Sequence, residues 1–297
     1  MPSVSDMVAA GLMPEHLYFH VPFCVSKCSY CDFFSVELAQ ARASASTVFE
    51  ALYEQWTEWV VRLGIRPART VYVGGGTPTA LPIDLLAAFV ADVAGQTCLA
   101  PDGELTVEAN PESLDRRVAD ALAAAGATRV SLGVQAFPDA LLAVLGRPHD
   151  ATRALRAAES VVAAGLDLAV DLICGIPGQT VGMWRASLEY AIEAGARHVS
   201  VYPLSLESGT PLAAEVMLGR YRALDDDVVA DMMLAARDVL ESAGLQRYEV
   251  ANYAVPGHEC RHNRAYWTAR EYLGMGPSAH GMLSASTARA AGFVVPE

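Results

Sequence analysis

The sequence predicts an α/β fold, and more narrowly a partial (β/α)6 barrel. Strand-like and helix-like segments alternate six times over about 190 residues, the pattern of a parallel sheet built from β/α units. Six units are fewer than the eight of a closed barrel, so we expect one side of the barrel to be open. Hydrophobic residues make up 53% of the chain, which is enough for a substantial buried core.

The first segments set this pattern. Leu17–Val21 is a short strand candidate that runs directly into a cysteine-rich loop. Thr47–Leu63 is predicted to be a helix because its large apolar residues recur near a 3.6-residue period. Thr70–Val73, with β-branched and aromatic residues, is the next strand and ends at three glycines. Leu85–Val93 is the helix that follows.

The same alternation continues to residue 204. Gly126 and Gly165 each follow a predicted helix, where a glycine commonly ends the helix by taking a left-handed conformation. The remaining expected strands are Glu104–Ala109, Arg129–Gln135, Leu168–Cys174 and His198–Leu204, and the expected helices are Asp115–Ala125, Ala151–Ala164 and Val181–Ala194.

The C-terminal part breaks the alternation. Leu224–Ala243 is predicted to be a long helix whose three N-terminal aspartates complement the helix dipole. Tyr248–Tyr253 is a further strand candidate, and Asn263–Gly281 is rich in glycine and aromatic residues. We therefore divide the chain into an N-terminal lead-in (1–16), the partial barrel (17–215), an extension that covers the barrel (216–283) and an atypical tail (284–297).

Composition excludes several classes of partner. The formal net charge is −13 and Lys27 is the only lysine, so we expect no nucleic-acid partner, because phosphate backbones are bound by clustered basic residues. No segment approaches the roughly 20 apolar residues that span a bilayer, so no integral membrane segment is expected. The N-terminus lacks the basic and then apolar pattern of a secretory signal. We expect a cytoplasmic protein.

Three of the six cysteines lie within eight residues, at Cys24, Cys28 and Cys31. Such a group indicates metal binding in a reducing compartment rather than disulfides. A [4Fe–4S] cube needs one ligand per iron, so a CxxxCxxC loop leaves one iron open to an amine and a carboxylate of a small molecule. The alternatives are a zinc site completed by His20, or buried thiols without a metal.

The run from Tyr18 to Cys31, with its YFHVPFC start, resembles radical S-adenosylmethionine (SAM) proteins. It is most similar to the group that contains oxygen-independent coproporphyrinogen III oxidases and their HemW-type relatives. The resemblance extends over about residues 16–281. It implies a partial (β/α)6 barrel of the radical SAM type, in agreement with the strand count, and a [4Fe–4S] cluster and SAM as cofactors.

A glycine-rich segment, Gly74–Pro78, follows the second expected strand, and barrel proteins build their sites at such carboxyl ends. Glycines allow a ligand to approach the backbone, and free N–H groups can meet a carboxylate or an amine. The segment could equally be a simple turn. The resemblance implies that Gly75, Gly76 and Thr77 meet the amino group of SAM.

Further polar residues stand near the ends of successive strands, where each alone could be an ordinary cap. The resemblance implies that they contact SAM, with the carboxylates near the ribose hydroxyls or the sulfonium and Arg147 near the SAM carboxylate. It also places Tyr18 and the backbone near Tyr30 beside SAM. The strand-end residues are Glu108, Gln135, Arg147 and Asp171.

Two features bear on the activity. Coproporphyrinogen oxidases of this type carry a fourth cysteine two places after the third, where this chain has Phe33. The run from His262 to Trp267 resembles the HNxxYW motif that HemW-type haem chaperones carry and that is associated with haem binding. An imidazole can ligate haem iron and aromatic rings can stack on a porphyrin. The same residues could instead cap a helix and pack on the barrel.

The resemblance therefore implies a protein that binds haem, with His262 as the candidate ligand, and passes it to acceptor proteins such as respiratory enzymes. No catalytic residue and no electron donor are assigned. The alternative is an enzyme in which reductive cleavage of SAM gives a 5′-deoxyadenosyl radical that attacks a propionate side chain before decarboxylation. Another radical SAM activity, such as methyl transfer or haem degradation, is a third hypothesis. The segment from Leu283 onward does not align with the C-terminal domain of the relatives.

Overall fold

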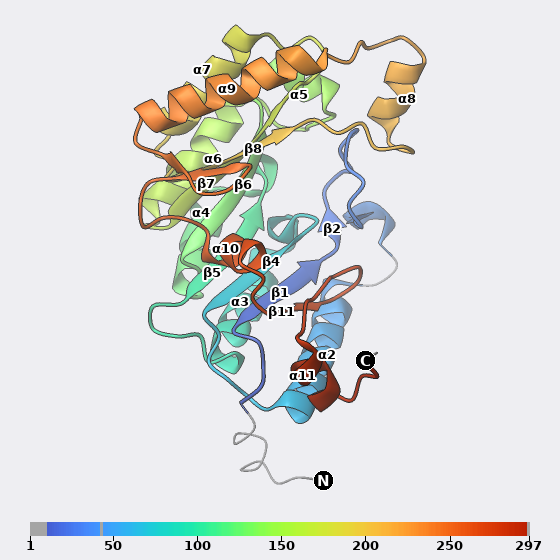
Figure 1. Cartoon of the computed structure of the whole chain (residues 1–297), viewed down its shortest axis with the longest axis vertical. Helices are drawn as coiled ribbons and strands as arrows, with labels where there is room; N and C mark the ends of the chain where they lie inside the picture. The colour runs from blue at the N-terminus through green and yellow to red at the C-terminus, as the bar shows by residue number, and fades with distance from the viewer. Residues whose placement is uncertain (1–10, 42–43, 296–297) are drawn as a thin grey trace.

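A mostly parallel sheet of nine strands forms the centre of the computed structural model, which describes residues 11–41 and 44–295 (Figure 1). The strands are β1 (His16–Val21), β4 (Thr70–Gly75), β5 (Glu104–Ala109), β6 (Arg129–Gln135), β7 (Asp167–Cys174), β8 (His198–Pro203), β9 (Gln246–Arg247), β10 (Asn252–Ala254) and β11 (Tyr272–Met275). Their order across the sheet is β11-β1-β4-β5-β6-β7-β8-β10-β9. The six strands from β1 to β8 are parallel, β11 joins one edge in parallel, and β10 and β9 are antiparallel at the other edge.

Helices follow the parallel strands and cover one face of the sheet (Figure 1). Several begin at a side chain that accepts a hydrogen bond from the backbone N–H three residues later, as Asp115, Asp150 and Thr180 do. Among the described residues, no helix is long and apolar enough to cross a membrane. The helices are α2 (Ala45–Leu63), α3 (Ile83–Gln96), α4 (Arg116–Ala124), α5 (Asp139–Val144), α6 (Ala151–Ala163), α7 (Val181–Glu193), α8 (Pro211–Met217), α9 (Asp226–Ser242), α10 (Arg261–Trp267) and α11 (Ala285–Ala290), with 3-10 turns η1 (Leu38–Gln40), η2 (Pro78–Ala80) and η3 (Pro111–Ser113).

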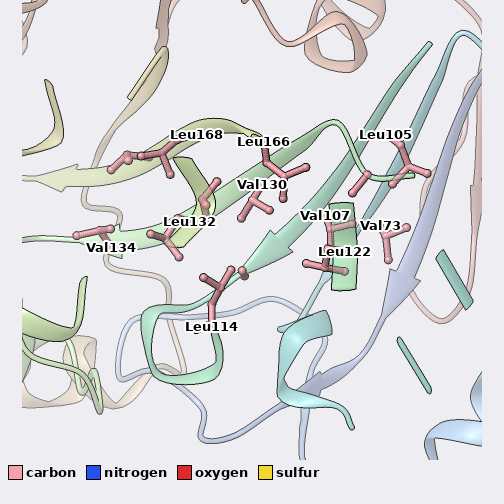
Figure 2. Packing of buried hydrophobic residues seen from close by; sticks show 14 of the residues in the cluster. Val73, Leu105, Val107, Leu114, Leu122, Val130, Leu132, Val134, Leu166 and Leu168 are labelled. Carbon is pink, nitrogen blue, oxygen red and sulfur yellow. The ribbon is translucent and has the colours of Figure 1, made fainter. Parts of the chain in front are cut away.

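The two faces of the sheet differ in chemistry because successive side chains of a strand point to opposite sides. One set is apolar and packs beneath the helices, as Val107, Val130 and Leu132 do (Figure 2). Each fully buried side chain of this kind contributes about 1.5–3 kcal/mol to folding. The other set is mostly polar and includes Glu104 on β5 and Arg129 on β6. This polar face is the one that forms the site.

The six predicted strands and the predicted helices are confirmed, with ends that differ by at most three residues. The prediction of a single strand at Tyr248–Tyr253 is wrong. The chain instead forms β9 and β10 on either side of a bend, in which the Ala251 backbone N–H donates to Glu249 Oε1 at 2.8 Å. A carboxylate that binds its own backbone in this way interrupts the strand.

Two elements that were not predicted fall in or overlap the glycine- and aromatic-rich segment: β11 lies within it, and α10 begins two residues before it. The four residues of β11 include a glycine, and they form a strand because they pair with β1, with Leu273 opposite Leu17. The tail forms α11, which packs on α2 through a 2.8 Å bond from Arg62 Nη1 to the Ala291 carbonyl. Most of the expected lead-in, residues 1–10, lies outside the described residues.

We predict that Trp184→Phe lowers the free energy of unfolding by about 2–4 kcal/mol. Trp184 is fully buried on α7, and its Nε1 donates to the Met232 carbonyl of α9 at 2.8 Å. The smaller ring leaves that carbonyl unpaired and opens a cavity. Urea denaturation measures the change. Tyr190→Phe, on the exposed side of the same helix, serves as the control and should change stability by less than about 0.5 kcal/mol.

Candidate functional site

A cavity of about 790 Å³ lies on the polar face of the sheet. Its lining comes from all six parallel strands, the cysteine loop and α10. Every residue that the sequence analysis singled out for cofactor or metal binding lines it: Tyr18, Cys24, Cys28, Tyr30, Cys31, Gly75, Gly76, Thr77, Glu108, Gln135, Arg147, Asp171 and His262. The structure thus brings all of them together around one space.

The cysteine loop is held at both its ends and its middle. Two short strands, β2 (Phe23–Cys24) and β3 (Val36–Glu37), pair with each other and close the loop. At the middle, the Ser29 N–H donates to the Leu145 carbonyl at 3.0 Å, and the Leu212 N–H donates to the Ser29 carbonyl at 2.8 Å. The loop therefore has a defined position against α5 and α8 before any cofactor is added.

Asn110 connects two of the thiols through side-chain hydrogen bonds. Its Nδ2 donates to Thr77 Oγ1 at 2.7 Å, and the Thr77 hydroxyl in turn donates to Cys24 Sγ at 3.7 Å. Its Oδ1 accepts from Arg147 Nη2 at 2.7 Å, while Arg147 Nη1 donates to Cys28 Sγ at 3.1 Å. Donors directed at sulfur stabilise a thiolate, the form that binds iron.

All three loop cysteines are free thiols. Burial raises the pKa of Cys24 and of Cys31, although hydrogen bonds to each sulfur work in the opposite direction. Within residues 11–41 and 44–295, no three His, Cys, Asp or Glu side chains converge closely enough to hold a single metal ion. A [4Fe–4S] cube does not require convergence on one point, because each thiolate binds a different iron.

The glycine-rich segment fits tightly against its neighbours. Gly75 has a φ of +114°, and a Cβ there would lie 2.7 Å from the His20 ring, so only glycine fits. The expectation of free N–H groups is wrong. The N–H of Gly75 donates to Glu108 at 2.9 Å, and those of Gly76 and Thr77 donate to the carbonyls of Val21 and Phe23 at 2.8 and 2.6 Å.

Two carboxylates lie on neighbouring parts of the cavity wall. Glu108 accepts from the Gly75 N–H and from the Tyr72 hydroxyl, each at 2.9 Å. Burial, with a smaller contribution from nearby Asp171, raises the pKa of Glu108 to about 7 despite these two hydrogen bonds. Asp171 accepts from Ser131 Oγ at 2.9 Å, and burial raises its pKa as well. Both groups therefore favour a hydroxyl or a positive charge in the cavity.

Gln135 marks an irregularity in the sheet. Its φ is +68°, which is strained for a residue with a side chain, and the pairing of β6 with β7 shifts register between Gly133 and Gln135. Such strain is common where a strand end must aim a side chain at a ligand. Gln135 lines the cavity at this point.

His262 is deeply buried on α10, with 1% of its surface exposed. Its Nδ1 is 2.7 Å from Thr70 Oγ1 and its Nε2 is 2.7 Å from the Tyr266 hydroxyl. Burial lowers the pKa of His262 to about 3, so the ring is neutral at ordinary pH. Both nitrogens are thus engaged within the protein, while Trp267 of the same motif is 63% exposed.

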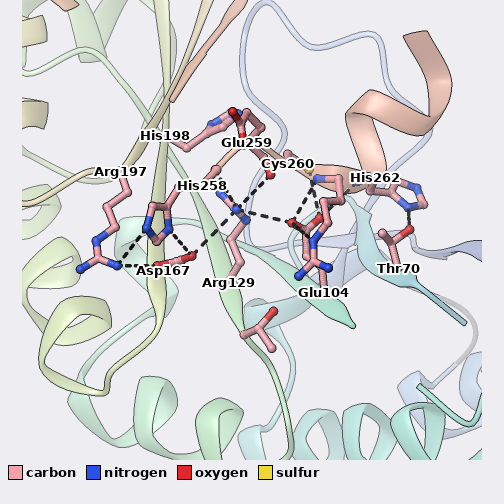
Figure 3. A network of polar contacts seen from close by, with 12 residues as sticks. Thr70, Glu104, Arg129, Asp167, Arg197, His198, His258, Glu259, Cys260 and His262 are labelled. Carbon is pink, nitrogen blue, oxygen red and sulfur yellow. Dashed lines mark hydrogen bonds and ion pairs between the residues drawn. The ribbon is translucent and has the colours of Figure 1, made fainter. Parts of the chain in front are cut away.

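A buried ion pair holds the segment that carries His262 (Figure 3). Arg129 Nη2 lies 3.4 Å from Glu104 Oε2, and both side chains are 4% exposed. Arg129 Nη2 also donates to the His258 carbonyl at 2.9 Å, and Glu104 accepts from the His262 N–H at 3.2 Å. A buried pair requires such additional hydrogen bonds to offset its desolvation. The pair therefore fixes the start of α10 over the barrel.

The sequence analysis missed several residues of the cavity wall. Only polar residues near strand ends were considered, whereas polar residues also occupy every second position deeper in the strands. The two-residue alternation in the sequence was the signal that could have identified them. They are Tyr72, Thr106, Arg129, Ser131, His198 and Ser200, together with Asn110 after β5.

We predict that Glu108→Gln removes one contribution to the pH dependence of stability in the ligand-free protein. Between pH 4.5 and about 7 the folded protein keeps a proton on Glu108 that the unfolded chain has released, so the stabilisation from this group falls as the pH rises through this window. The loss amounts to about 3 kcal/mol. Urea denaturation at pH 5 and pH 8 measures it. The buried, neutral His198 and His262 contribute a slope of the opposite sign in both proteins, so the variant is compared with the wild type at each pH. A stability difference between the two proteins that is the same at pH 5 and pH 8 would contradict the raised pKa of Glu108.

Comparison with known proteins places these features in a family. The radical SAM superfamily matches residues 18–191. "Heme chaperone HemW" of Mycobacterium tuberculosis is 42% identical over 272 residues, which cover 91% of this chain and 70% of that protein. "Heme chaperone HemW" of Escherichia coli is 36% identical over 276 residues, which cover 92% of this chain and 71% of that protein.

Among solved structures, coproporphyrinogen III oxidase (HemN) from Escherichia coli has a TM-score of 0.76 over 94% of this chain and 67% of that chain. At 24% identity this similarity shows the shared fold. The superfamily match implies a [4Fe–4S] cluster and SAM as cofactors. With its match over more than half of the sequence and its HemW relatives, this chain belongs to the radical SAM superfamily and, within it, to the HemW family.

Proposed function

We propose that Cys24, Cys28 and Cys31 hold one [4Fe–4S] cluster, and that SAM binds at the iron without a cysteine ligand. The observation that carries this proposal is the hydrogen-bond connection from Cys24 through Thr77, Asn110 and Arg147 to Cys28. It directs two donors at sulfur on the wall of a cavity large enough for a nucleotide. The free thiols fit a reducing compartment such as the cytoplasm.

The SAM residues proposed from the sequence have complementary chemistry. Glu108 and Asp171 supply acceptors for ribose hydroxyls or for the positive sulfonium side. Arg147 retains an Nε without a partner among the described residues, and we assign this donor to the SAM carboxylate. Since the N–H groups from Gly75 to Thr77 are occupied, we assign the SAM amino group to backbone carbonyls of this segment. Tyr18, Tyr30 and Gln135 complete the wall.

The cluster supplies electrons to SAM when both are bound. The residues of this chain position the cluster and SAM relative to each other. Arg147 is 3% exposed on its side chain and is held by Asn110 Oδ1 and the Gly133 carbonyl, each at 2.7 Å, so its charge is fixed beside Cys28. A fixed charge costs no reorganisation when a negative group arrives.

The function that we propose for the whole protein is that of a haem chaperone, which is the name its HemW relatives carry. In this role it would bind haem and pass it to acceptor proteins. His262 is the proposed haem ligand, and both it and Tyr266 line the cavity. In the ligand-free arrangement, the Tyr266 hydroxyl occupies Nε2 of His262. Iron ligation through Nε2 therefore requires Tyr266 to move, and this residue is 37% exposed, which leaves it room to do so.

Replacing any one of Cys24, Cys28 and Cys31 with Ala should abolish the cluster's visible absorbance, because two thiolates cannot hold a cube at three corners. Anaerobic reconstitution, iron and sulfide analysis and Mössbauer spectroscopy measure the cluster. Cys98→Ala is the matched control, since Cys98 is exposed and away from the cavity. A variant of the loop that retains a full four-iron cube, or a wild-type cube with four protein ligands, would contradict the proposal.

For haem, we expect opposite effects from two neighbouring substitutions. His262→Ala should remove the Soret shift that marks imidazole ligation in anaerobic haem titrations. Tyr266→Phe removes a hydrogen bond that competes for Nε2, so it should tighten haem binding by about 3- to 10-fold. Unchanged spectra and affinity in both variants would exclude His262 as the ligand. Conversion of coproporphyrinogen III to its divinyl product by the reconstituted wild type would favour the oxidase alternative.

A further inference from the structure

The cavity has a polar floor that neither the cluster nor SAM explains. We define the cavity floor as Thr106 of β5, Arg129 of β6 and His198 of β8, which are 1%, 4% and 2% exposed. All three line the cavity near the amino-terminal ends of the strands, whereas the cysteine loop lies at the opposite, carboxyl-terminal ends. Each retains at least one buried polar atom without a partner in the described part of the chain.

Strand register places these three side chains next to one another on one face. Thr106 and Arg129 are direct partners on neighbouring parallel strands. On the far side of Arg129, β7 pairs Asp167 with Arg129 and pairs Ala169, two residues on, with His198. Figure 3 shows Arg129, with its ion-pair network, and His198 in one view. The charge of Arg129 is close enough to lower the pKa of His198, after the larger effect of burial.

The unused atoms of the floor are predominantly hydrogen-bond donors. Arg129 commits Nη2 to Glu104 and to the His258 carbonyl, which leaves Nε and Nη1 without partners. Thr106 Oγ1 and His198 Nδ1 are also unpartnered. An unpaired buried donor costs about 1–3 kcal/mol, and more when it is charged. When several such donors surround one cavity, an acceptor that enters the cavity and binds them stabilises the folded protein.

The charged neighbours of Arg129 determine which of its N–H groups are left for a ligand. Arg129 faces two carboxylates, Glu104 at 3.4 Å and Asp167 at 4.0 Å. Each of these also has a second guanidinium, Arg261 at 4.0 Å from Glu104 and Arg197 at 3.4 Å from Asp167. Arg197 and Arg261 are 56% and 50% exposed on their side chains, so water screens them as it screens Asp102, the further neighbour of Arg261 at 3.9 Å. The buried, unpartnered N–H groups of Arg129, rather than an excess of charge, are therefore what favours an acceptor on the floor.

His198 adds a neutral group to this arrangement. Its Nε2 is bonded to the Tyr248 hydroxyl at 2.8 Å, and burial lowers its pKa to about 3. The ring therefore contributes no charge, and its Nδ1 is free to donate to an oxygen when Tyr248 donates to Nε2. The N–H groups of Arg129 and the Thr106 hydroxyl supply the other donors. A carboxylate has two oxygens that accept about four hydrogen bonds, which suits this set.

We propose that Thr106, Arg129 and His198 form a carboxylate-binding subsite on the cavity floor. Its ligand is an organic acid, or the carboxylate arm of a larger molecule that extends from the floor toward the cysteine loop. The inference goes beyond the proposed haem function and does not depend on it. The three residues of the subsite contact neither the three loop cysteines nor the ring nitrogens of His262. The alternative is a purely structural floor whose free donors are hydrated.

Trifluoroacetate is a suitable probe, because it is a small carboxylate that is ionised at any ordinary pH. The experiment titrates it into the full-length, anaerobically reconstituted protein and follows binding by ¹⁹F NMR. We expect saturable binding that Arg129→Gln abolishes. Thr106→Val removes only an unpartnered hydroxyl and keeps the side-chain shape, so it should fold like the wild type and weaken binding by about 3- to 10-fold.

Two controls separate a carboxylate subsite from other causes. Thr97→Val makes the same chemical change at a buried threonine that bonds the Val93 carbonyl at 2.7 Å outside the cavity, and should leave binding unchanged. Trifluoroethanol carries the same CF₃ group without the charge and should not bind. Absence of saturable binding, equal binding by Thr106→Val and wild type, or equal binding of trifluoroethanol would each overturn the proposal, even if Arg129→Gln fails to fold.

Discussion

The polar inner face of the parallel sheet is the constraint on which the rest of this structure depends. Polar groups removed from water must find partners, and a buried charge must find several. Glu104 and Arg129 meet this requirement with backbone groups of residues 258–262, which lie about 130–160 positions further along the chain. The C-terminal segment is therefore an integral part of the barrel interior, and α10 begins where this ion pair needs donors and acceptors.

The same constraint applies where the cavity meets the cysteine loop, at the carboxyl-terminal ends of the strands. Thr77, Asn110 and Arg147 come from three separate connections after β4, β5 and β6, yet their side chains form one hydrogen-bonded series between two thiols. Nearly every donor of this series already has an acceptor, so the cysteine loop has little freedom to rearrange. A preformed arrangement of this kind lowers the ordering entropy that cofactor binding would otherwise have to overcome.

The HNxxYW residues have a structural role that coexists with the proposed haem function. His262 bridges Thr70 and Tyr266, and Asn263 lies beside Tyr248, which in turn bonds His198. The motif thus joins α10 to the barrel wall through neutral hydrogen bonds in the ligand-free state. Haem ligation would exchange one of these bonds for a bond to iron, so binding and the docking of α10 are energetically linked.

The sequence by itself determined the local features: the six β/α units, the capped helices and the three closely spaced thiols, because each depends on residues within one or two turns of chain. Only the tertiary structure decided the long-range ones. Strand β11 exists because Leu273 pairs opposite Leu17, and the N–H groups from Gly75 to Thr77 are occupied because their acceptors lie on other segments. Thr70, the partner of His262 Nδ1, likewise comes from a distant strand that no local pattern encodes.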